Sequence, residues 1–233
     1  MRRPVQFNDK PVTMRRIAAY VIGMFILSLG ISLSVKSQMG VSPVTSVPYT
    51  VSRVLHMSVG MGTIIVYCLY IFAEFLIYRK QFRLTYLIQL PASFVFGWFI
   101  DLTGLILGPI DHHGIFAVQL VMIVISVMLV ALGVRIYLTA DIMAIPSDAL
   151  TVAISWATKK PLHRCKLFFD CGSVAVALAL SLSVFRDWEG IWIGTVLAAL
   201  GVGQALRLYT VLFEERLKKF IFGTENFLPQ VTE

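Results

Sequence analysis

Six long, nearly uncharged apolar runs constrain this chain more than any other feature of its sequence. They cover residues 17–35, 59–78, 87–108, 115–138, 171–185 and 191–212, and the fifth extends back to about residue 163. An α-helix needs about 20 mainly apolar residues to cross the hydrocarbon core of a bilayer. Of the 233 residues 58% are hydrophobic and only 14% are charged, whereas soluble domains are about 25% charged. The sequence therefore predicts an all-α integral membrane protein with six transmembrane helices.

The flanks of these runs set the predicted boundaries. We place the spans at about 17–36, 59–78, 87–108, 115–138, 163–185 and 191–212, between an N-terminal segment (1–16) and a C-terminal tail (213–233). The first run is too long for a cleavable signal peptide, and no small-residue cleavage site follows it. The net charge of +7 does not indicate a nucleic-acid partner, because the basic residues lie at helix ends, where they report orientation in the membrane.

The two halves of the chain resemble one another. The stretch LGISLSVKSQMGVSPVTSVPYTVS, from Leu29, aligns without gaps on LGVRIYLTADIMAIPSDALTVAIS, from Leu132, at an offset of 103 residues that pairs Pro43 with Pro146. In each half a long run is followed by a polar break, a short segment and two more long runs. Weak internal symmetry of this kind is typical of transporters built from repeats. We therefore expect a duplication, the alternative being that two apolar stretches look alike by composition.

Each half also contains a segment too short to cross the membrane. Residues 44–55 and 147–156 would form helices of at most ~18 Å, at ~1.5 Å per residue, against ~30 Å of hydrocarbon. Pro43 and Pro146 suit the first turn of a helix, because proline lacks the N–H that would be unpaired there. We therefore expect two re-entrant hairpins, over residues 37–55 and 139–157.

The positions of the basic residues favour this topology. With a cytoplasmic N-terminus and no crossing by the short segments, all but three of the 20 Lys and Arg residues lie on the cytoplasmic side, the exceptions being Lys36, Arg53 and Arg186. The positive-inside rule prefers this arrangement over crossing by one or both segments. Repeat 1 (17–110) and repeat 2 (111–212) then cross three times each. The sequence predicts a 3+3 inverted repeat with both termini in the cytoplasm.

The polar breaks and the starts of the short segments are the candidate binding site. In inverted-repeat transporters such breaks meet near the middle of the membrane, and the free N–H groups of a helix N-terminus attract anionic groups. The candidate substrate-binding residues surround the two prolines: Ser42, Pro43, Thr45, Ser46, Pro146, Ser147 and Asp148. The alternative is a passive hairpin that fills space between the spans.

Three aspartates, Asp101, Asp141 and Asp148, are candidates for ion coupling or for lining a polar path. Ionisable residues at membrane depth usually serve a function. For Asp148, in the first turn of the second short segment, a plain helix cap is the competing interpretation. For Asp101, within the third run, the prediction is a wet path or a buried pair.

Other polar residues of the runs have structural interpretations. Glu74 with Arg79, and Lys166 with Asp170, are expected to form ion pairs near the membrane surface. Gln89 is a candidate for a hydrogen bond between helices. None of these residues belongs to the predicted binding site.

No pattern in the sequence indicates an enzyme. There is no phosphate-binding loop, nucleophile elbow or zinc-protease motif, and the three cysteines, Cys68, Cys165 and Cys171, lack the spacing of a metal site. We therefore predict no catalytic residue, no bound metal and no cofactor.

Three stretches carry a family resemblance: MGVSPVTSVPYTVS (39–52), FVFGWFIDL (94–102) and GIWIGTVLAALGVGQALRL (190–208). On these motifs the chain resembles the YczE/YyaS/YitT-like family of bacterial integral membrane proteins, over about residues 16–212. The resemblance implies a multi-pass protein of the bacterial inner membrane and leaves the function open.

Taken together, these features predict a small secondary transporter or channel-like permease. We expect a small anionic or zwitterionic solute to bind between the two hairpins. The other expected partner is the lipid bilayer, and the protein could also form homo-oligomers. The alternative is a non-transporting membrane partner that stabilises or localises another protein.

Overall fold

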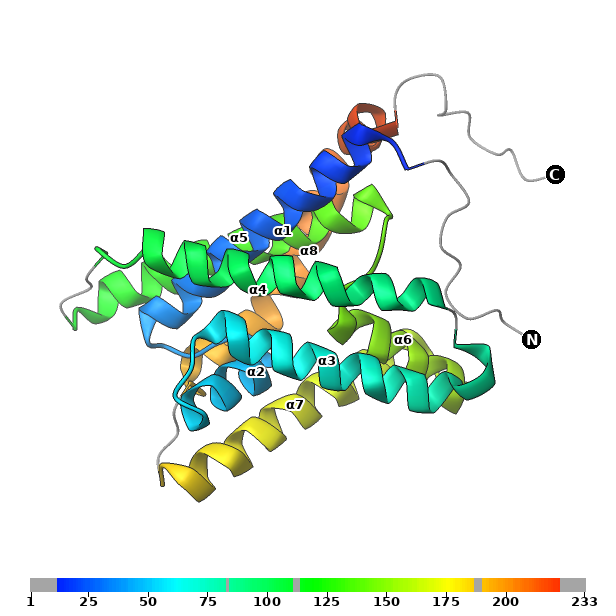
Figure 1. Ribbon diagram of the computed structural model, residues 1–233. Helices are drawn as coiled ribbons and strands as arrows, with labels where there is room; N and C mark the ends of the chain where they lie inside the picture. The colour runs from blue at the N-terminus through cyan, green and yellow to red at the C-terminus, as the bar shows by residue number, and fades with distance from the viewer. Residues whose placement is uncertain (1–11, 83, 111–113, 187–189, 223–233) are drawn as a thin grey trace.

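The computed structural model describes residues 12–82, 84–110, 114–186 and 190–222, and within them the chain is helical (Figure 1). The helices are α1 (Met14–Ser37), α2 (Pro43–Val54), α3 (Val59–Tyr78), α4 (Gln89–Ile106), α5 (Phe116–Ala140), α6 (Pro146–Thr158), α7 (Leu162–Val184) and α8 (Ile193–Phe222). Two 3-10 turns, η1 (Arg79–Gln81) and η2 (Leu84–Ile88), join α3 to α4.

Six of these elements are long and apolar enough to cross a membrane, namely α1, α3 with η1, η2 with α4, α5, α7 and α8. The six predicted long helices are therefore confirmed, and the protein is a multi-pass membrane protein. The last helix continues to Phe222, ten residues past the predicted end of the sixth span. The rest of both terminal segments, 1–11 and 223–233, lies outside the described residues.

The two short helices begin where the prolines predict. Pro43 and Pro146 occupy the first turns of α2 and α6, which have 12 and 13 residues. Each break follows a left-handed residue that ends the preceding long helix, Gln38 at φ 56° and Asp141 at φ 50°. These two residues are aligned in the sequence comparison of the halves, and their N–H groups bond back to the carbonyls of Val35 and Leu138, which are aligned as well.

The centre of the molecule is a close crossing of α1 and α5. A Cβ at Gly30 would lie 2.7 Å from the backbone N of Val130, and a Cβ at Gly133 would lie 2.4 Å from the backbone N of Leu27. Ser126 donates to the carbonyl of Gly30 at 2.8 Å. Because later residues of α1 meet earlier residues of α5, the helices run antiparallel, and glycines at the crossing let the backbones touch.

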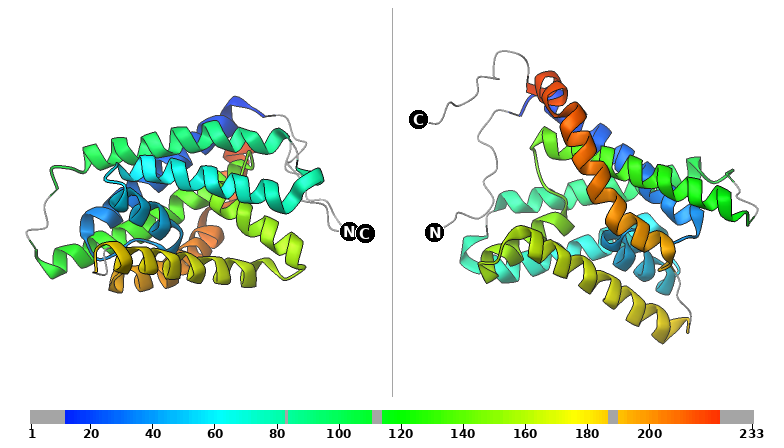
Figure 2. Two further views of the ribbon diagram at one scale, coloured as in Figure 1. Left: turned by 60° about the horizontal axis from the view of Figure 1, so that its bottom comes forward. Right: turned by 180° about the vertical axis from the view of Figure 1, so that it is seen from behind.

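The remaining helices pack around this pair. Helix α4 lies against α1, and α8 lies against α5 and touches α1 (Figure 2, right). Helix α2 packs on α3 and α7, and α6 packs on the same two helices. The described ends of the chain lie together, since the Arg16 guanidinium is 5.3 Å from the ring centre of Phe222.

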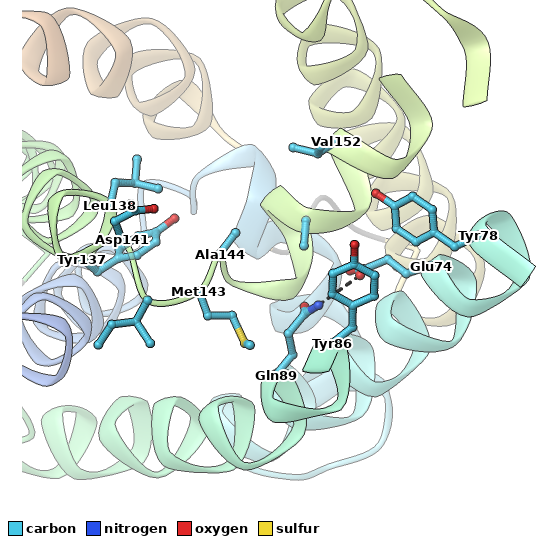
Figure 3. Close-up of a pocket in the computed structure, with 12 residues that line it drawn as sticks. Glu74, Tyr78, Tyr86, Gln89, Tyr137, Leu138, Asp141, Met143, Ala144 and Val152 are labelled. Carbon is cyan, nitrogen blue, oxygen red and sulfur yellow. Dashed lines mark hydrogen bonds between the residues drawn. The ribbon is translucent and has the colours of Figure 1, made fainter. Parts of the chain in front are cut away.

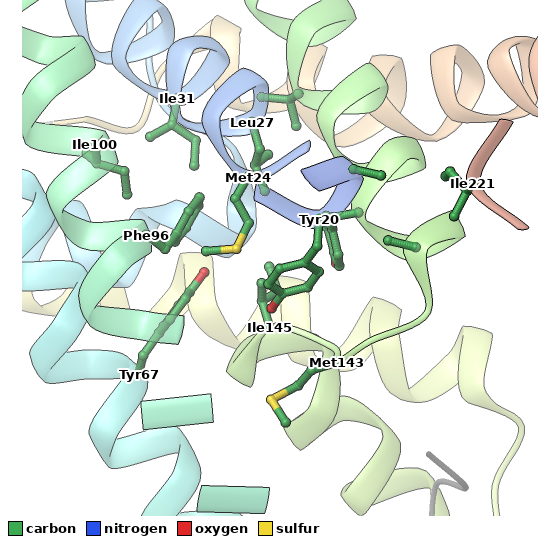
Figure 4. Packing of buried hydrophobic residues seen from close by; sticks show 14 residues of the cluster. Tyr20, Met24, Leu27, Ile31, Tyr67, Phe96, Ile100, Met143, Ile145 and Ile221 are labelled. Atoms are coloured by element: carbon green, nitrogen blue, oxygen red, sulfur yellow. The ribbon is translucent and has the colours of Figure 1, made fainter. Parts of the chain in front are cut away.

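The apolar core lies between α1, α3, α4 and the second break (Figure 4). Its buried members include Tyr20, Met24, Leu27, Ile31, Tyr67, Phe96, Ile100, Met143 and Ile145. By contrast, in the most apolar stretches of α7 and α8 only 17% and 11% of the residues are buried. These two helices therefore present most of their apolar surface to lipid, where it incurs no hydration cost.

Candidate functional site

The first break, between α1 and α2, is closed by the start of α8. Val41 donates its backbone N–H to the carbonyl of Gly190 at 3.0 Å, and Gly194 donates its N–H to the carbonyl of Met39 at 2.8 Å. Gly40 has a φ of 116°, and a Cβ there would lie 2.6 Å from Thr195 Oγ1. Backbone groups that leave a helix inside a membrane protein must find partners, and here Gly190, just before α8, and Gly194, in its first turn, supply two of them.

The hydroxyl groups around Pro43 are occupied within their own turn. Ser42 Oγ and Thr45 Oγ1 lie 3.0 Å apart, and Thr45 also donates to the carbonyl of Ser42. Ser46 is fully buried and donates to the carbonyl of Pro43 at 2.7 Å. Of the four predicted binding residues of the first half, Pro43, Thr45 and Ser46 are therefore buried and Ser42 is partly buried, and the three hydroxyls are already paired.

The second break, between α5 and α6, lines a pocket of about 130 Å³ (Figure 3). Residues of α3, η2, the start of α4, the end of α5, the break and α6 surround it: Glu74, Tyr78, Tyr86, Gln89, Tyr137, Leu138, Asp141, Ile142, Met143, Ala144, Ala149 and Val152. Of the predicted site residues only Asp141 is among them. The pocket lies toward the end of the bundle that carries the start of α1, because Arg16 donates to the carbonyls of Ala140 and Asp141.

Glu74 and Gln89 are buried together beside this pocket. Their side chains are 1% and 2% exposed, and Gln89 Nε2 donates to Glu74 Oε2 at 3.0 Å. The Oε1 atoms of both residues are buried without a hydrogen-bond partner among the described residues. The expected hydrogen bond of Gln89 between helices is confirmed. The expected surface ion pair of Glu74 with Arg79 is wrong, because Glu74 turns inward whereas Arg79 begins η1 and is exposed.

Aromatic side chains form one wall of the same pocket. The rings of Tyr78 and Tyr86 stack with centres 5.5 Å apart and planes 26° apart. Trp156 of α6 lies behind Tyr78 at 5.4 Å. In Figure 3 the two tyrosines stand beside the Glu74–Gln89 pair. Since η2 brings Tyr86 into this wall, the pocket depends on the connection between α3 and α4.

Asp148, the predicted coupling residue, lies directly behind the pocket. Its Oδ2 accepts from the hydroxyl of Tyr137 at 2.5 Å, and its Oδ1 accepts from Lys166 Nζ at 2.9 Å. Lys166 also lies 3.4 Å from Asp170, which confirms that predicted ion pair. The neighbouring Ser147 is fully buried.

The other two aspartates contact or form helix ends: Asp101 of α4 binds the start of α3, and Asp141 is the C-cap of α5. Asp101 accepts from the backbone N–H of Gly60 at 2.8 Å and from Ser58 Oγ at 2.7 Å, so it caps the start of α3. Asp141 is exposed at the mouth of the pocket. A role for either in coupling stays a prediction. Arg16, which the sequence alone places at the membrane surface, is 2% exposed and holds the end of α5.

The two sets of predicted binding residues are not joined. The hydrogen bonds of Ser42, Thr45 and Ser46 stay on their own turn, whereas Asp148 is bonded to α5 and α7. The pocket therefore belongs to the second break rather than to both. Within the described part of the chain no group of three His, Cys, Asp or Glu side chains is placed to hold a metal ion.

Comparison with known proteins places the chain in a family. The model of a family of unknown function, DUF6198, matches residues 14–211, so the chain belongs to this family. It is 28% identical over 195 residues to YyaS of Bacillus subtilis (strain 168), described as an uncharacterized protein, with 84% of this chain and 92% of YyaS covered. It is 26% identical over 192 residues to YczE of the same strain, described as an uncharacterized membrane protein, with 81% and 82% covered. The resemblance to YyaS and YczE is thus confirmed, and no solved structure matches the chain.

Proposed function

We propose that this member of the DUF6198 family is a small secondary transporter of the bacterial inner membrane. Its halves would form an inverted repeat with one re-entrant hairpin each, and the pocket at the second break would be its solute site. One observation carries the proposal: of two corresponding breaks, the first is closed by the start of α8 and the second opens into a pocket.

The inverted repeat is supported by the exchange of partners between the halves. At the offset of 103 residues, Gly30 of the first half aligns with Gly133, and Val130 of the second half aligns with Leu27. The contact of Gly30 with Val130 therefore has a counterpart in the contact of Gly133 with Leu27, and both contacts are present. The packing of α1 on α4 corresponds to that of α5 on α8. A two-fold axis between antiparallel α1 and α5 produces such pairs. Antiparallel α1 and α5 also fit three crossings per half, whereas four crossings would make them parallel.

Alternating access is supported by the unequal state of the two breaks. In transporters built from inverted repeats, the halves take two conformations and exchange them, so that the central site faces each side in turn. Near the end of each half, GWFIDL from Gly97 aligns with GQALRL from Gly203, at an offset of 106 residues. By this offset η2 is the counterpart of the segment that closes the first break. We infer that η2 closes the second break in the opposite state, while the start of α8 withdraws from the first.

The orientation follows from the basic residues. With the positive-inside rule, the end of the bundle that holds Arg16 faces the cytoplasm, and the pocket opens there. Of the two solute classes that the sequence suggests, a zwitterion fits this lining better than a plain anion. The lining carries Glu74 and Asp141 and no Lys, Arg or His, and the α2 N-terminus, which was expected to attract anions, is covered.

Thiol labelling of the two breaks tests this proposal, and it does not depend on the identity of the solute. Val41→Cys and Ala144→Cys are made singly in a chain whose Cys68, Cys165 and Cys171 are replaced by Ser. A membrane-impermeant thiol reagent is then applied to vesicles of either orientation. Alternating access predicts fast labelling at residue 144 from the cytoplasmic side. At residue 41, which is 1% exposed, it predicts slow labelling from the opposite side only.

A reversible lock supplies the control. A Cβ at Gly194 would lie 3.0 Å from the Cβ of Met39, and disulfides span about 3.8 Å between Cβ atoms. A slight retreat of α8 thus admits a disulfide in the Met39→Cys/Gly194→Cys chain. Oxidation should stop labelling at residue 41, leave residue 144 reactive and be reversed by a reducing agent. Labelling of both residues from one side would refute the inverted arrangement.

A non-transporting membrane partner is the second candidate, because α7 and α8 present wide apolar faces that suit a partner helix as well as lipid. Such a protein has no need to open its first break. It would leave residue 41 unreactive from both sides, with and without the lock.

A further inference from the structure

We infer that the pocket at the second break binds the ammonium group of a small organic solute, with Glu74 as its counter-ion. This inference rests on the proposed function to the extent that it names the solute class of the same pocket. Glu74 and Gln89 on neighbouring helices supply the acceptors, and Tyr78 with Tyr86 supplies an aromatic wall.

Glu74 is a buried carboxylate without a cation. Its side chain is 1% exposed, one oxygen accepts from Gln89, and the other has no hydrogen-bond partner among the described residues. A buried carboxylate is costly unless a positive charge or a proton neutralises it. Since no Lys, Arg or His lines the pocket, a proton neutralises Glu74 while the pocket is empty, and a cation that enters the pocket can take the place of that proton.

Gln89 adds a second acceptor beside the first. Its amide nitrogen is used by Glu74, and its Oε1 atom is buried without a partner among the described residues. Two unpaired oxygens at one wall call for a ligand that donates hydrogen bonds or carries positive charge. A ligand whose only charged group is a carboxylate or phosphate would instead face two acceptors and would be repelled by Glu74.

The tyrosine wall fits the same class of ligand. Tyr78 and Tyr86 stack on each other beside the Glu74–Gln89 pair (Figure 3). Aromatic rings attract ammonium groups through their negative faces, and cages of such rings recognise quaternary ammonium ligands. The pocket, at about 130 Å³, suits a small head group.

The other intramembrane acids do not share this situation. Asp148 is paired with Lys166 and Tyr137, Asp101 caps α3, and Asp170 lies beside Lys166. Each already has a donor from the protein. Glu74 has only half of its carboxylate satisfied, which is why the inference falls on it.

Three probes of similar shape and different charge test the inference on the full-length protein in detergent. Tetramethylammonium is cationic, tert-butanol is neutral and pivalate is anionic, and all carry a compact head of methyl groups. Thermal unfolding is followed over a concentration series of each at constant ionic strength. We expect tetramethylammonium to stabilise the protein at concentrations at least about tenfold lower than tert-butanol, and pivalate to have no stabilising effect. Equal stabilisation by all three, or preference for pivalate, would overturn the inference.

Two substitutions of the same chemistry locate the effect. Glu74→Gln keeps the shape of the side chain and removes a buried charge, so the fold is expected to persist; it should weaken tetramethylammonium binding at least about tenfold. Glu214→Gln makes the same change on α8, where Glu214 pairs with Arg135 and Lys218, and should leave binding unchanged. Glu74→Asp keeps the charge and should keep the preference for the cation. Unaltered binding by Glu74→Gln refutes the assignment.

The outcome is separable from that of the proposed function. If tetramethylammonium binding depends on Glu74 but the first break never opens, the inferred site stands and the proposed transporter function is refuted. If the two breaks are labelled from opposite sides but the protein does not distinguish the three probes by charge, the proposed transporter function stands and the inferred ammonium site is refuted.

Discussion

The close crossing of α1 and α5 predicts that one substitution, Gly→Ala, has opposite effects on stability at two positions. It should destabilise the protein at Gly133, within the crossing, and leave it equally or more stable at Gly203, outside the crossing. A Cβ at Gly133 would lie 2.4 Å from the backbone N of Leu27, whereas a Cβ at Gly203 of α8 meets nothing within 4 Å. Ordinary contact begins at 3.4 Å, so Gly133→Ala forces the two backbones apart by about 1 Å, the difference of those two distances. Overpacking of this kind costs about 1–3 kcal/mol.

The control works in the other direction. Gly203 lies within a helix, and replacing an unpacked helical glycine by alanine stabilises a helix by up to about 1 kcal/mol. We therefore expect Gly133→Ala to unfold at lower denaturant and Gly203→Ala at equal or higher denaturant than the parent. Sodium dodecyl sulfate titration of the protein in mixed micelles, followed by circular dichroism, measures both. If Gly133→Ala is as stable as Gly203→Ala, the closeness of the crossing is not what holds α1 to α5.

Three further predictions concern the charged contacts of the described chain. Arg16→Met keeps the apolar stem but leaves the carbonyls at the end of α5 without their donor. We therefore expect the free energy of unfolding to fall by about 2–4 kcal/mol in the same titration. Lys166→Met and Asp148→Asn should be non-additive, with a coupling on the order of 1 kcal/mol in a double-mutant cycle, because the two side chains share an ion pair. Asp101→Ala should cost about 0.5–2 kcal/mol, because it removes the acceptors at the start of α3, and should leave the labelling of both breaks unchanged.

Much of the fold is accessible from sequence because its strongest determinants are local. Twenty apolar residues in a row leave little alternative to a spanning helix, and a proline that follows a polar break leaves little alternative to a new helix start. The starts of α2 and α6 therefore agree with the prediction to within a residue. The aligned left-handed residues Gln38 and Asp141 carry no comparable signal, since neither is a residue type that requires this conformation.

The candidate site is less accessible because it depends on packing between distant helices. The spacing of Glu74 from Arg79 suggests a surface ion pair, but which face of α3 turns inward is decided by α4 and η2. Asp148 is recognisable from its place in the first turn of α6. Its partner Lys166 is not, because that contact depends on how α6 lies against α7. Periodicity identifies a buried face only when apolar and polar residues alternate, and in a lipid-facing helix both faces are apolar.

The chemical inequality of the two halves is compatible with their structural likeness. An alternating-access protein needs halves of similar shape, because each must adopt the conformation that the other leaves. It does not need halves of similar chemistry, because one solute site is enough. In this chain the first half uses its hydroxyls to close its own turn at Pro43. The second half places Asp148 and Lys166 behind the pocket, and α3 and α4 of the first half bring Glu74 and Gln89 to it. The pocket is thus built where the second break meets α3 and α4 of the first half, so the movement of one half against the other that the proposed function requires must change its shape.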